Sequence, residues 1–197
     1  MGRRADHSRD ELFELILSKA VEVVENEGIS ALTARRVSKE VGYSAGTIYN
    51  LFENLDALSL HVKAHTLDAL FNHIKDIPQG ESVEKDILAL NAAYFNFLKL
   101  NPNTWGSILD RVGANGQPLP EWYLAKVALP FSVIENALQP LFDNDKQAAE
   151  YAAHTLWCGV HGIAVLEMEN SLEAMGGQDA HMMAVYLIKN FIRGVKA

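Results

Sequence analysis

The 197-residue sequence has few of the features that would cross-link the chain or anchor it in a bilayer. It contains one cysteine, Cys158, so no disulfide can form within the chain, which suits a reducing compartment. No stretch is long and apolar enough to span a membrane, and the amino terminus lacks the apolar core of a secretory signal. We therefore expect a cytoplasmic protein with no membrane contact.

The sequence motifs of common catalytic sites are also missing. There is no nucleophile elbow, no phosphate-binding loop, no His-Glu-x-x-His and no Gly-x-Gly-x-x-Gly. Cys158 lies inside an apolar stretch, where a buried and inert thiol is expected more often than a nucleophile. The sequence therefore predicts neither a cofactor nor an enzymatic activity.

Basic residues are not in excess, since 17 Lys and Arg face 25 Asp and Glu for a net charge of −8. The acidic excess is concentrated in the second part of the chain. Residues 1–52 hold seven basic and eight acidic residues, whereas residues 53–197 carry a net charge of −7. The charge distribution permits nucleic-acid binding by the first part but does not predict it.

Apolar residues recur at helical spacing along nearly the whole chain, and no segment alternates as a strand does. We predict an all-α protein of about nine helices, with a three-helix domain over residues 1–53 and a helical bundle over 54–197. The predicted helices cover about 8–27, 33–41, 44–51, 54–77, 82–101, 102–112, 120–142, 146–170 and 179–195. Pro130 is expected to kink or break its helix.

Capping residues indicate where the first three predicted helices begin. Ser8 and Glu11 form a capping-box pattern, and Thr33 and Ser44 are N-cap candidates for the two short helices. The three residues from Gly42 to Ser44 form a tight turn between those helices. Two short helices joined in this way indicate a helix-turn-helix.

The segment 33–52, TARRVSKEVGYSAGTIYNLF, resembles the DNA-binding signature of the TetR family of bacterial repressors. The Gly-Thr-Ile-Tyr run and the Phe three residues after its Tyr stand in the family's register. Further along, residues 157–162 resemble the Trp-x-x-x-His-Gly motif of one subgroup of the family's carboxyl-terminal domains. The resemblance implies a homodimeric, sequence-specific regulator that binds a palindromic operator in double-stranded DNA. It also implies a repressor that a small-molecule effector, of unknown identity, releases.

The resemblance also assigns DNA contacts to particular residues. Thr33, Arg35 and Tyr49 fall at phosphate contacts, with Arg36 beside them. Base edges would be read by Ser44, Ala45, Thr47 and Asn50, and Gly46 would let the backbone come close to DNA. Arg3 and Arg4 would form a basic arm. Leu55 replaces the family's usual lysine, which predicts one phosphate contact fewer and a shallow salt dependence of DNA affinity.

The second part of the chain offers residues for an effector pocket and for a dimer interface. Pocket candidates are Tyr94, Trp105, Trp122, Tyr123, His154, Trp157 and His161, which could equally be ordinary core. The small residues Gly159, Gly162 and Ala164 would let two helices approach closely. The resemblance places that contact between subunits, and the alternative is close packing within one subunit.

A metal-binding function remains open as an alternative, based on the predicted helix over residues 146–170. His154, Cys158 and His161 recur at spacings of four and three, so they share a helix face and could ligate a metal ion. The alternative function is therefore a helical metal-binding or metal-sensing protein. His61 and His65 form a similar pair, for which a partly exposed helix surface is the simpler interpretation.

Overall fold

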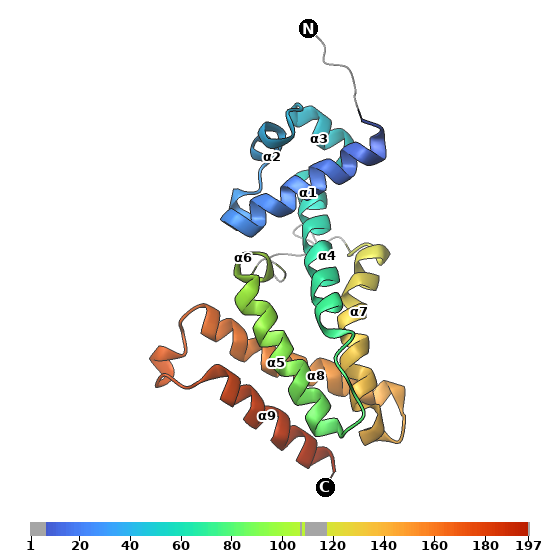
Figure 1. Ribbon diagram of the computed structural model, residues 1–197, viewed down its shortest axis with the longest axis vertical. Helices are drawn as coiled ribbons and strands as arrows, with labels where there is room; N and C mark the ends of the chain where they lie inside the picture. The colour runs from blue at the N-terminus through green and yellow to red at the C-terminus, as the bar shows by residue number, and fades with distance from the viewer. Residues whose placement is uncertain (1–6, 107, 109–117, 197) are drawn as a thin grey trace. The chain divides into compact units, whose positions relative to one another are not determined.

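The structure, a computed structural model, describes residues 7–106, 108 and 118–196. Within these residues it contains nine α-helices and no strand, which confirms the predicted all-α fold (Figure 1). The helices are α1 (Arg9–Glu27), α2 (Ala34–Val41), α3 (Ala45–Phe52), α4 (Leu55–Ile74), α5 (Val83–Leu100), α6 (Pro102–Trp105), α7 (Glu121–Leu138), α8 (Lys146–Met168) and α9 (Ala180–Val195). Short 3₁₀ turns lie at Ile29–Ala31, Gln139–Phe142 and Glu173–Met175.

The predicted caps explain where the first helices begin. Ser8 and Glu11 form a full capping box at the start of α1. The Thr33 hydroxyl accepts a hydrogen bond from the Arg36 backbone N–H at 3.1 Å, and the Ser44 hydroxyl accepts one from Thr47 at 3.2 Å. Each cap satisfies a backbone donor that the first helical turn leaves without an intrahelical partner.

Pro130 does not break α7, because the helix is continuous from Glu121 to Leu138. A proline removes one N–H and crowds the preceding turn, but a long helix with a buried face keeps its remaining hydrogen bonds. Of the expected kink or break, the break was therefore wrong, and the kink stays a prediction.

The chain divides into two compact units. Unit 1 comprises the chain up to Thr66 together with Asn101–Tyr123, and unit 2 comprises Leu67–Leu100 and the chain from Leu124 onward. Helices α4 and α7 each contribute to both units. Unit 1 extends beyond residue 53, and a functional division at that residue stays a prediction.

Unit 1 is built around one apolar core. Its fully buried members come from four helices: Ile16, Ala20 and Val24 of α1, Val37 of α2, Ile48 and Phe52 of α3, and Leu58 and Val62 of α4. Helix α6 also belongs to this unit, and the Asn103 side chain donates a hydrogen bond to the Glu25 backbone carbonyl at 2.8 Å. The core fixes α2 and α3 against α1, so the rest of each short helix faces outward.

Unit 2 is a bundle in which α9 packs against both α5 and α8. Its buried face is formed by residues such as Ala184, Ile188 and Ile192. A Cβ atom added at Gly159 of α8 would lie 2.6 Å from a terminal carbon of Leu187, so the glycine lets α8 and α9 approach closely. Among the residues that the structure describes, no helix has both the length and the apolar character needed to cross a membrane.

Candidate DNA-binding surface

The outward face of α3 is small, polar and accessible. Ile48 points into the core of unit 1, and helical spacing turns the residues on either side of it outward. Gly46 and Asn50 are exposed, and Tyr49 is 46% exposed although it is a large aromatic residue. Tyr49 is therefore accessible to another molecule, and its contact with DNA stays a prediction.

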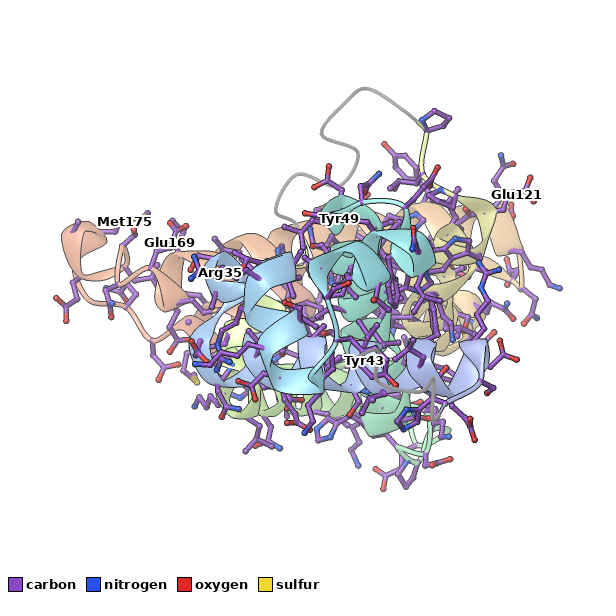
Figure 2. All side chains as sticks on the ribbon, turned by 90° about the horizontal axis from the view of Figure 1, so that it is seen from above. Arg35, Tyr43, Tyr49, Glu121, Glu169 and Met175 are labelled. Carbon is purple, nitrogen blue, oxygen red and sulfur yellow. The ribbon has the colours of Figure 1, made fainter. Side chains whose placement is uncertain are left out.

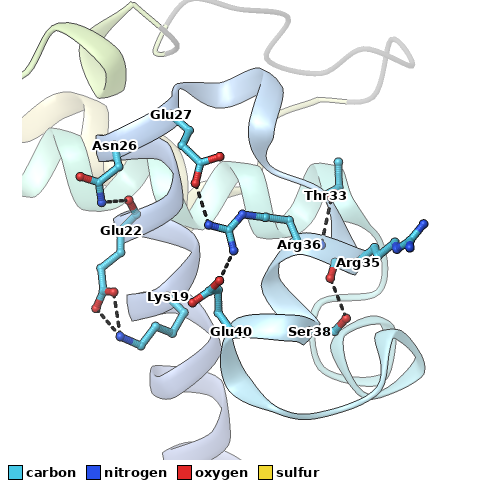
Figure 3. Close-up of polar contacts among 9 residues, drawn as sticks. All are labelled: Lys19, Glu22, Asn26, Glu27, Thr33, Arg35, Arg36, Ser38 and Glu40. Atoms are coloured by element: carbon cyan, nitrogen blue, oxygen red, sulfur yellow. Dashed lines mark hydrogen bonds and ion pairs between the residues drawn. The ribbon is translucent and has the colours of Figure 1, made fainter.

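The two neighbouring arginines of α2 have different environments (Figure 3). Arg36 turns toward α1, where its guanidinium forms an ion pair with Glu27 at 2.7 Å and a second one with Glu40. These two carboxylates raise the pKa of Arg36, Glu27 having the larger effect. Arg35 points away from this ion-pair cluster, and its backbone carbonyl accepts a hydrogen bond from the Ser38 hydroxyl at 3.0 Å. Arg35 is therefore exposed and turned away from these carboxylates, whereas Arg36 joins α2 to α1 through Glu27; a phosphate contact of Arg35 stays a prediction.

The polar side chains at the start of α3 are linked to each other. The hydroxyls of Ser44 and Thr47 lie 3.0 Å apart, in addition to the cap that Ser44 provides. Ala45 and Thr47 are half-buried, while Ser44 is exposed. Figure 2 labels Arg35 of α2, Tyr43 of the turn and Tyr49 of α3. Three of the predicted base-reading residues, Ser44, Ala45 and Thr47, thus lie at the amino-terminal end of α3, while Asn50 lies in its second half.

Few cations are available on this surface. Helix α3 contains no Lys or Arg, and α2 offers Arg35 and Lys39, both exposed. Leu55 packs against the core of unit 1, which explains why this position carries no phosphate-binding lysine. Arg3 and Arg4, predicted to form a basic arm, lie outside the residues that the structure describes.

Gly46 provides the sharpest single-residue test of this surface. A Cβ atom at this position would meet only the Ser44 hydroxyl, at an ordinary 3.6 Å, so the fold itself does not need a glycine. Gly46→Ala is expected to stabilise the protein by about 0.5–1 kcal/mol, because alanine favours the helix. The same change is expected to weaken DNA binding at least about tenfold, because the added methyl group would separate the backbone from DNA. Urea unfolding and fluorescence anisotropy would measure the two effects, and a variant that gained stability without losing affinity would contradict the close approach.

The predicted pocket residues are divided between the two units. Trp105 and Tyr123 are buried in unit 1, and Trp122 of the same unit is 41% exposed. Tyr94, His154, Trp157 and His161 belong to unit 2. The structure brings these four together, and whether they bind an effector stays a prediction.

An aromatic and imidazole cluster connects α5, α7 and α8 within unit 2. The Tyr94 hydroxyl and His161 Nδ1 are 2.6 Å apart and buried, and the Trp157 ring stacks on the His161 ring with centroids 4.6 Å apart. Phe131 of α7 contacts both Trp157 and the exposed His154. Burial lowers the pKa of His161, so its imidazole is neutral at pH 7.

The three small residues of α8 face different surroundings. Ala164 is 1% exposed and Gly159 lies against Leu187, so both pack within the protomer. Gly162 is exposed and has no atom within 4 Å of an added Cβ. A role for these residues between subunits stays a prediction, which the geometry supports at Gly162 only.

The possible metal ligands on α8 do not converge. His161 is buried and bonded to Tyr94, while His154 and Cys158 are exposed. Within the described part of the chain, no group of three or more His, Cys, Asp or Glu side chains could hold a metal ion. The metal-sensing alternative is therefore not favoured.

His61 of α4 has a role that the sequence did not reveal. Its ring stacks on Trp122 with centroids 4.4 Å apart, and it makes edge contacts with Phe13 and Phe52. The helical spacing of His61 and His65 suggested a surface pair, but a long-range aromatic cluster leaves no local pattern in a sequence. Burial lowers the pKa of His61, partly opposed by the nearby Glu14 carboxylate.

The lowered pKa of His61 predicts that the folded protein loses stability in acid. The unfolded chain binds a proton at His61 more readily than the folded protein does, so stability is complete above about pH 6.5 and falls as the pH drops below it. His61→Phe, which preserves the ring contacts, is expected to flatten this pH dependence in urea unfolding from pH 5 to 8. His161 shifts in the same direction, so part of the dependence should remain. His65→Gln, at an exposed position, is the control and should behave as the native chain.

Two short helices joined by a tight turn, held by a third helix and presenting an accessible polar face, define a helix-turn-helix DNA-binding protein. The comparisons refine this class. Residues 16–62 match the model of "Bacterial regulatory proteins, tetR family", and residues 87–191 match that of a "Tetracyclin repressor-like, C-terminal domain". The chain belongs to the TetR family of transcriptional regulators.

Individual proteins agree with this family assignment. An uncharacterised HTH-type transcriptional regulator of Mycobacterium tuberculosis is 24% identical over 81% of this chain and 72% of its own length. A protein of unknown function from Rhodococcus sp. RHA1 superposes with a TM-score of 0.72 at 17% identity, covering 100% of both chains. A TetR-family regulator from Streptomyces coelicolor has a TM-score of 0.69 at 14% identity, covering 100% of this chain and 84% of that one. The solved structures support the fold, and the family models support DNA-binding regulation.

Proposed function

We propose that the protein is a homodimeric repressor that binds a palindromic operator and is released by a small-molecule effector. The observation that carries this proposal is the outward face of α3, where Gly46, Tyr49 and Asn50 are exposed while Ile48 anchors the helix in the core. A helix held in this way can enter the major groove with its first turn against base edges. Because a bacterial operator lies in the cytoplasm, the protein would act there.

Within one half-site, we assign the contacts according to the environment of each side chain. Arg35, Thr33 and Tyr49 would bind phosphates, since all three are exposed. Ser44, Ala45, Thr47 and Asn50 would lie toward the bases, with Gly46 permitting close approach. Arg36 would act indirectly, because Glu27 and Glu40 already engage its guanidinium. A surface with so few cations should neutralise few phosphates and show a shallow salt dependence.

The second half-site requires a second copy of the chain, and α8 and α9 each present an accessible stripe for it. On α8 the stripe comprises Tyr151, Thr155, Cys158 and Gly162, all exposed and spaced by four, three and four residues. On α9 it contains Met182 and Tyr186, which are 61% and 73% exposed. Helices α8 and α9 pack against each other, and exposed large side chains such as Tyr151, Met182 and Tyr186 are more typical of a protein interface than of free surface. We propose that these two stripes form the dimer interface.

The first experiment is selection of bound duplexes from a random DNA pool by the full-length protein. Enrichment of a palindrome, whose half-site centres are separated by about one helical turn or somewhat more, would support a dimeric operator-binding protein. Failure of a folded dimer to enrich any sequence at low salt would contradict the proposal. The selected duplex then serves as the probe for every DNA-binding measurement below.

The neighbouring arginines provide a matched pair of variants. Arg35→Met is expected to weaken binding to the selected duplex at least about tenfold, because each half-site loses a charged contact to phosphate. Arg36→Met removes the same charge, but its guanidinium is directed at Glu27 and Glu40, so affinity should change less than about threefold. Fluorescence anisotropy would measure both, with circular dichroism confirming the fold. A larger loss for Arg36→Met would overturn the assignment of the two roles.

A further inference from the structure

The core of unit 2 contains a polar side chain that its surroundings do not satisfy. Asn91 of α5 is 5% exposed, and within the described part of the chain neither its Oδ1 nor its Nδ2 has a hydrogen-bond partner. A buried amide without partners is costly, by about 1–3 kcal/mol for each group, and is rare in native proteins. Such a group indicates a place where another molecule supplies the missing donor and acceptor.

Asn91 lies beside the polar pair already described. It precedes Tyr94 by three residues on α5, so the two side chains emerge from the same face of the helix, about 5–6 Å apart at Cβ. Tyr94 is in turn joined to His161 of α8, on which Trp157 stacks. Figure 1 shows α5 in green and α8 in orange within unit 2. A polar position and an aromatic wall therefore occur together, which is the composition of a small-molecule site.

The charges of unit 2 restrict what such a molecule can be. Among its described residues, the buried polar or charged side chains are Asp86, Asn91 and His161, and none of them is a lysine or arginine. The Asp86 carboxylate accepts a hydrogen bond from the Gly80 backbone at 2.8 Å, and the His161 imidazole is neutral at pH 7. An anionic group buried here would have no buried lysine or arginine of unit 2 to pair with, and that is strongly unfavourable. These residues therefore disfavour an anionic occupant and suit a neutral one.

We propose that Asn91 binds a neutral carboxamide or lactam, whose C=O accepts from Nδ2 and whose N–H donates to Oδ1, while the aromatic residues of the cluster hold its apolar part. An amide presents a donor beside an acceptor, which is the arrangement an asparagine side chain can pair with twice. The inference rests on the proposed function in taking unit 2 as the ligand-sensing part, and it adds the chemical class of the effector.

The test measures binding to the full-length protein without DNA, by isothermal titration calorimetry at pH 8. The probes are benzamide, cinnamamide and 2-naphthamide, each compared with its carboxylate: benzoate, cinnamate and 2-naphthoate. At least one carboxamide should bind ten times or more tightly than its carboxylate. Binding of none of the three, or equal or tighter binding of the carboxylates, would overturn the proposal.

Variants of Asn91 separate a ligand site from a buried amide that water satisfies. Asn91→Leu, of similar size, should lower carboxamide affinity at least tenfold and raise the melting temperature of the free protein, because it removes two unsatisfied groups. Asn91→Ala replaces it if the leucine variant does not fold. Asn72→Leu, at an exposed asparagine of α4 in the same unit, is the matched control and should leave affinity unchanged. A higher melting temperature with unchanged carboxamide affinity would mean that Asn91 only holds water, and would overturn the proposal.

Binding of the selected operator duplex by the ligand-free protein is measured in parallel. If the duplex binds and no carboxamide does, the inference fails while the DNA-binding function stands. If a carboxamide binds through Asn91 but no duplex is bound, the site stands and the proposed repressor function fails.

Discussion

The double variant Thr47→Ala, Tyr49→Ala is expected to lose at least about 100-fold in affinity for the selected palindrome. Each subunit would lose one contact at a base edge and one at a phosphate, so the dimer loses four contacts of about 1 kcal/mol or more each. Tyr49 is 46% exposed, so its removal should cost the fold little. Fluorescence anisotropy against the labelled duplex measures the effect.

Two controls show whether the loss of affinity comes from sequence-specific DNA contacts rather than from unfolding or from weaker non-specific binding. The melting temperature of the double variant should stay within a few degrees of the native value, since Thr47 contributes only a hydroxyl linked to Ser44. Binding to a scrambled duplex should fall less than binding to the palindrome, because the scrambled duplex loses the Tyr49 phosphate contacts but has no specific base contact of Thr47 to lose. Retention of full affinity for the palindrome would mean that α3 is not the reading helix.

A second large effect is expected from the proposed dimer interface. Tyr151→Glu combined with Tyr186→Glu places charges on the exposed stripes of α8 and α9, and two copies would bring four carboxylates into one contact. The protein should then run as a 21.8 kDa monomer in light scattering, rather than as a dimer of about twice that mass. Operator affinity should fall at least about 100-fold, because a monomer holds one half-site at a time.

Leu100→Glu is the matched control for that variant. Leu100 is 67% exposed at the end of α5 and lies outside both stripes, so its substitution adds charge to unit 2 without touching the proposed interface. It should leave mass and operator affinity unchanged. A dimer that persisted with both tyrosines replaced would place the interface elsewhere on the protein.

Local features of the fold were predictable from the sequence for physical reasons. The hydroxyl caps at Ser8, Thr33 and Ser44 act within three residues, so their spacing is visible in the sequence and the first helices were placed closely. The expected break at Pro130 was wrong because the rest of α7 stays continuous around one missing hydrogen bond. Capping is thus a more reliable local signal than a single proline in a long helix.

Contacts between distant segments were not predictable in this way. The resemblance placed both Arg35 and Arg36 among the DNA contacts, whereas Arg36 pairs with Glu40 nearby and with Glu27, nine residues before it, a contact that no local pattern predicts. In the same way, no local sequence pattern predicts that His61 stacks on Trp122, or that Asn91 lacks a hydrogen-bond partner among the described residues. The resemblance predicts which residues form the DNA-reading surface, but it could not supply the partners of individual side chains.

The passage of α4 and α7 through both units has a consequence for exchanging parts between regulators. A chimera that transfers the operator-reading part to another sensor has to be joined inside a helix, where one inserted residue turns the chain by about 100° and advances it by about 1.5 Å. A graft of the first 53 residues alone would also leave behind α6, whose Asn103 is bonded to the end of α1. Successful grafts should therefore recur at joins spaced by whole helical turns, and should carry residues 101–123 with them.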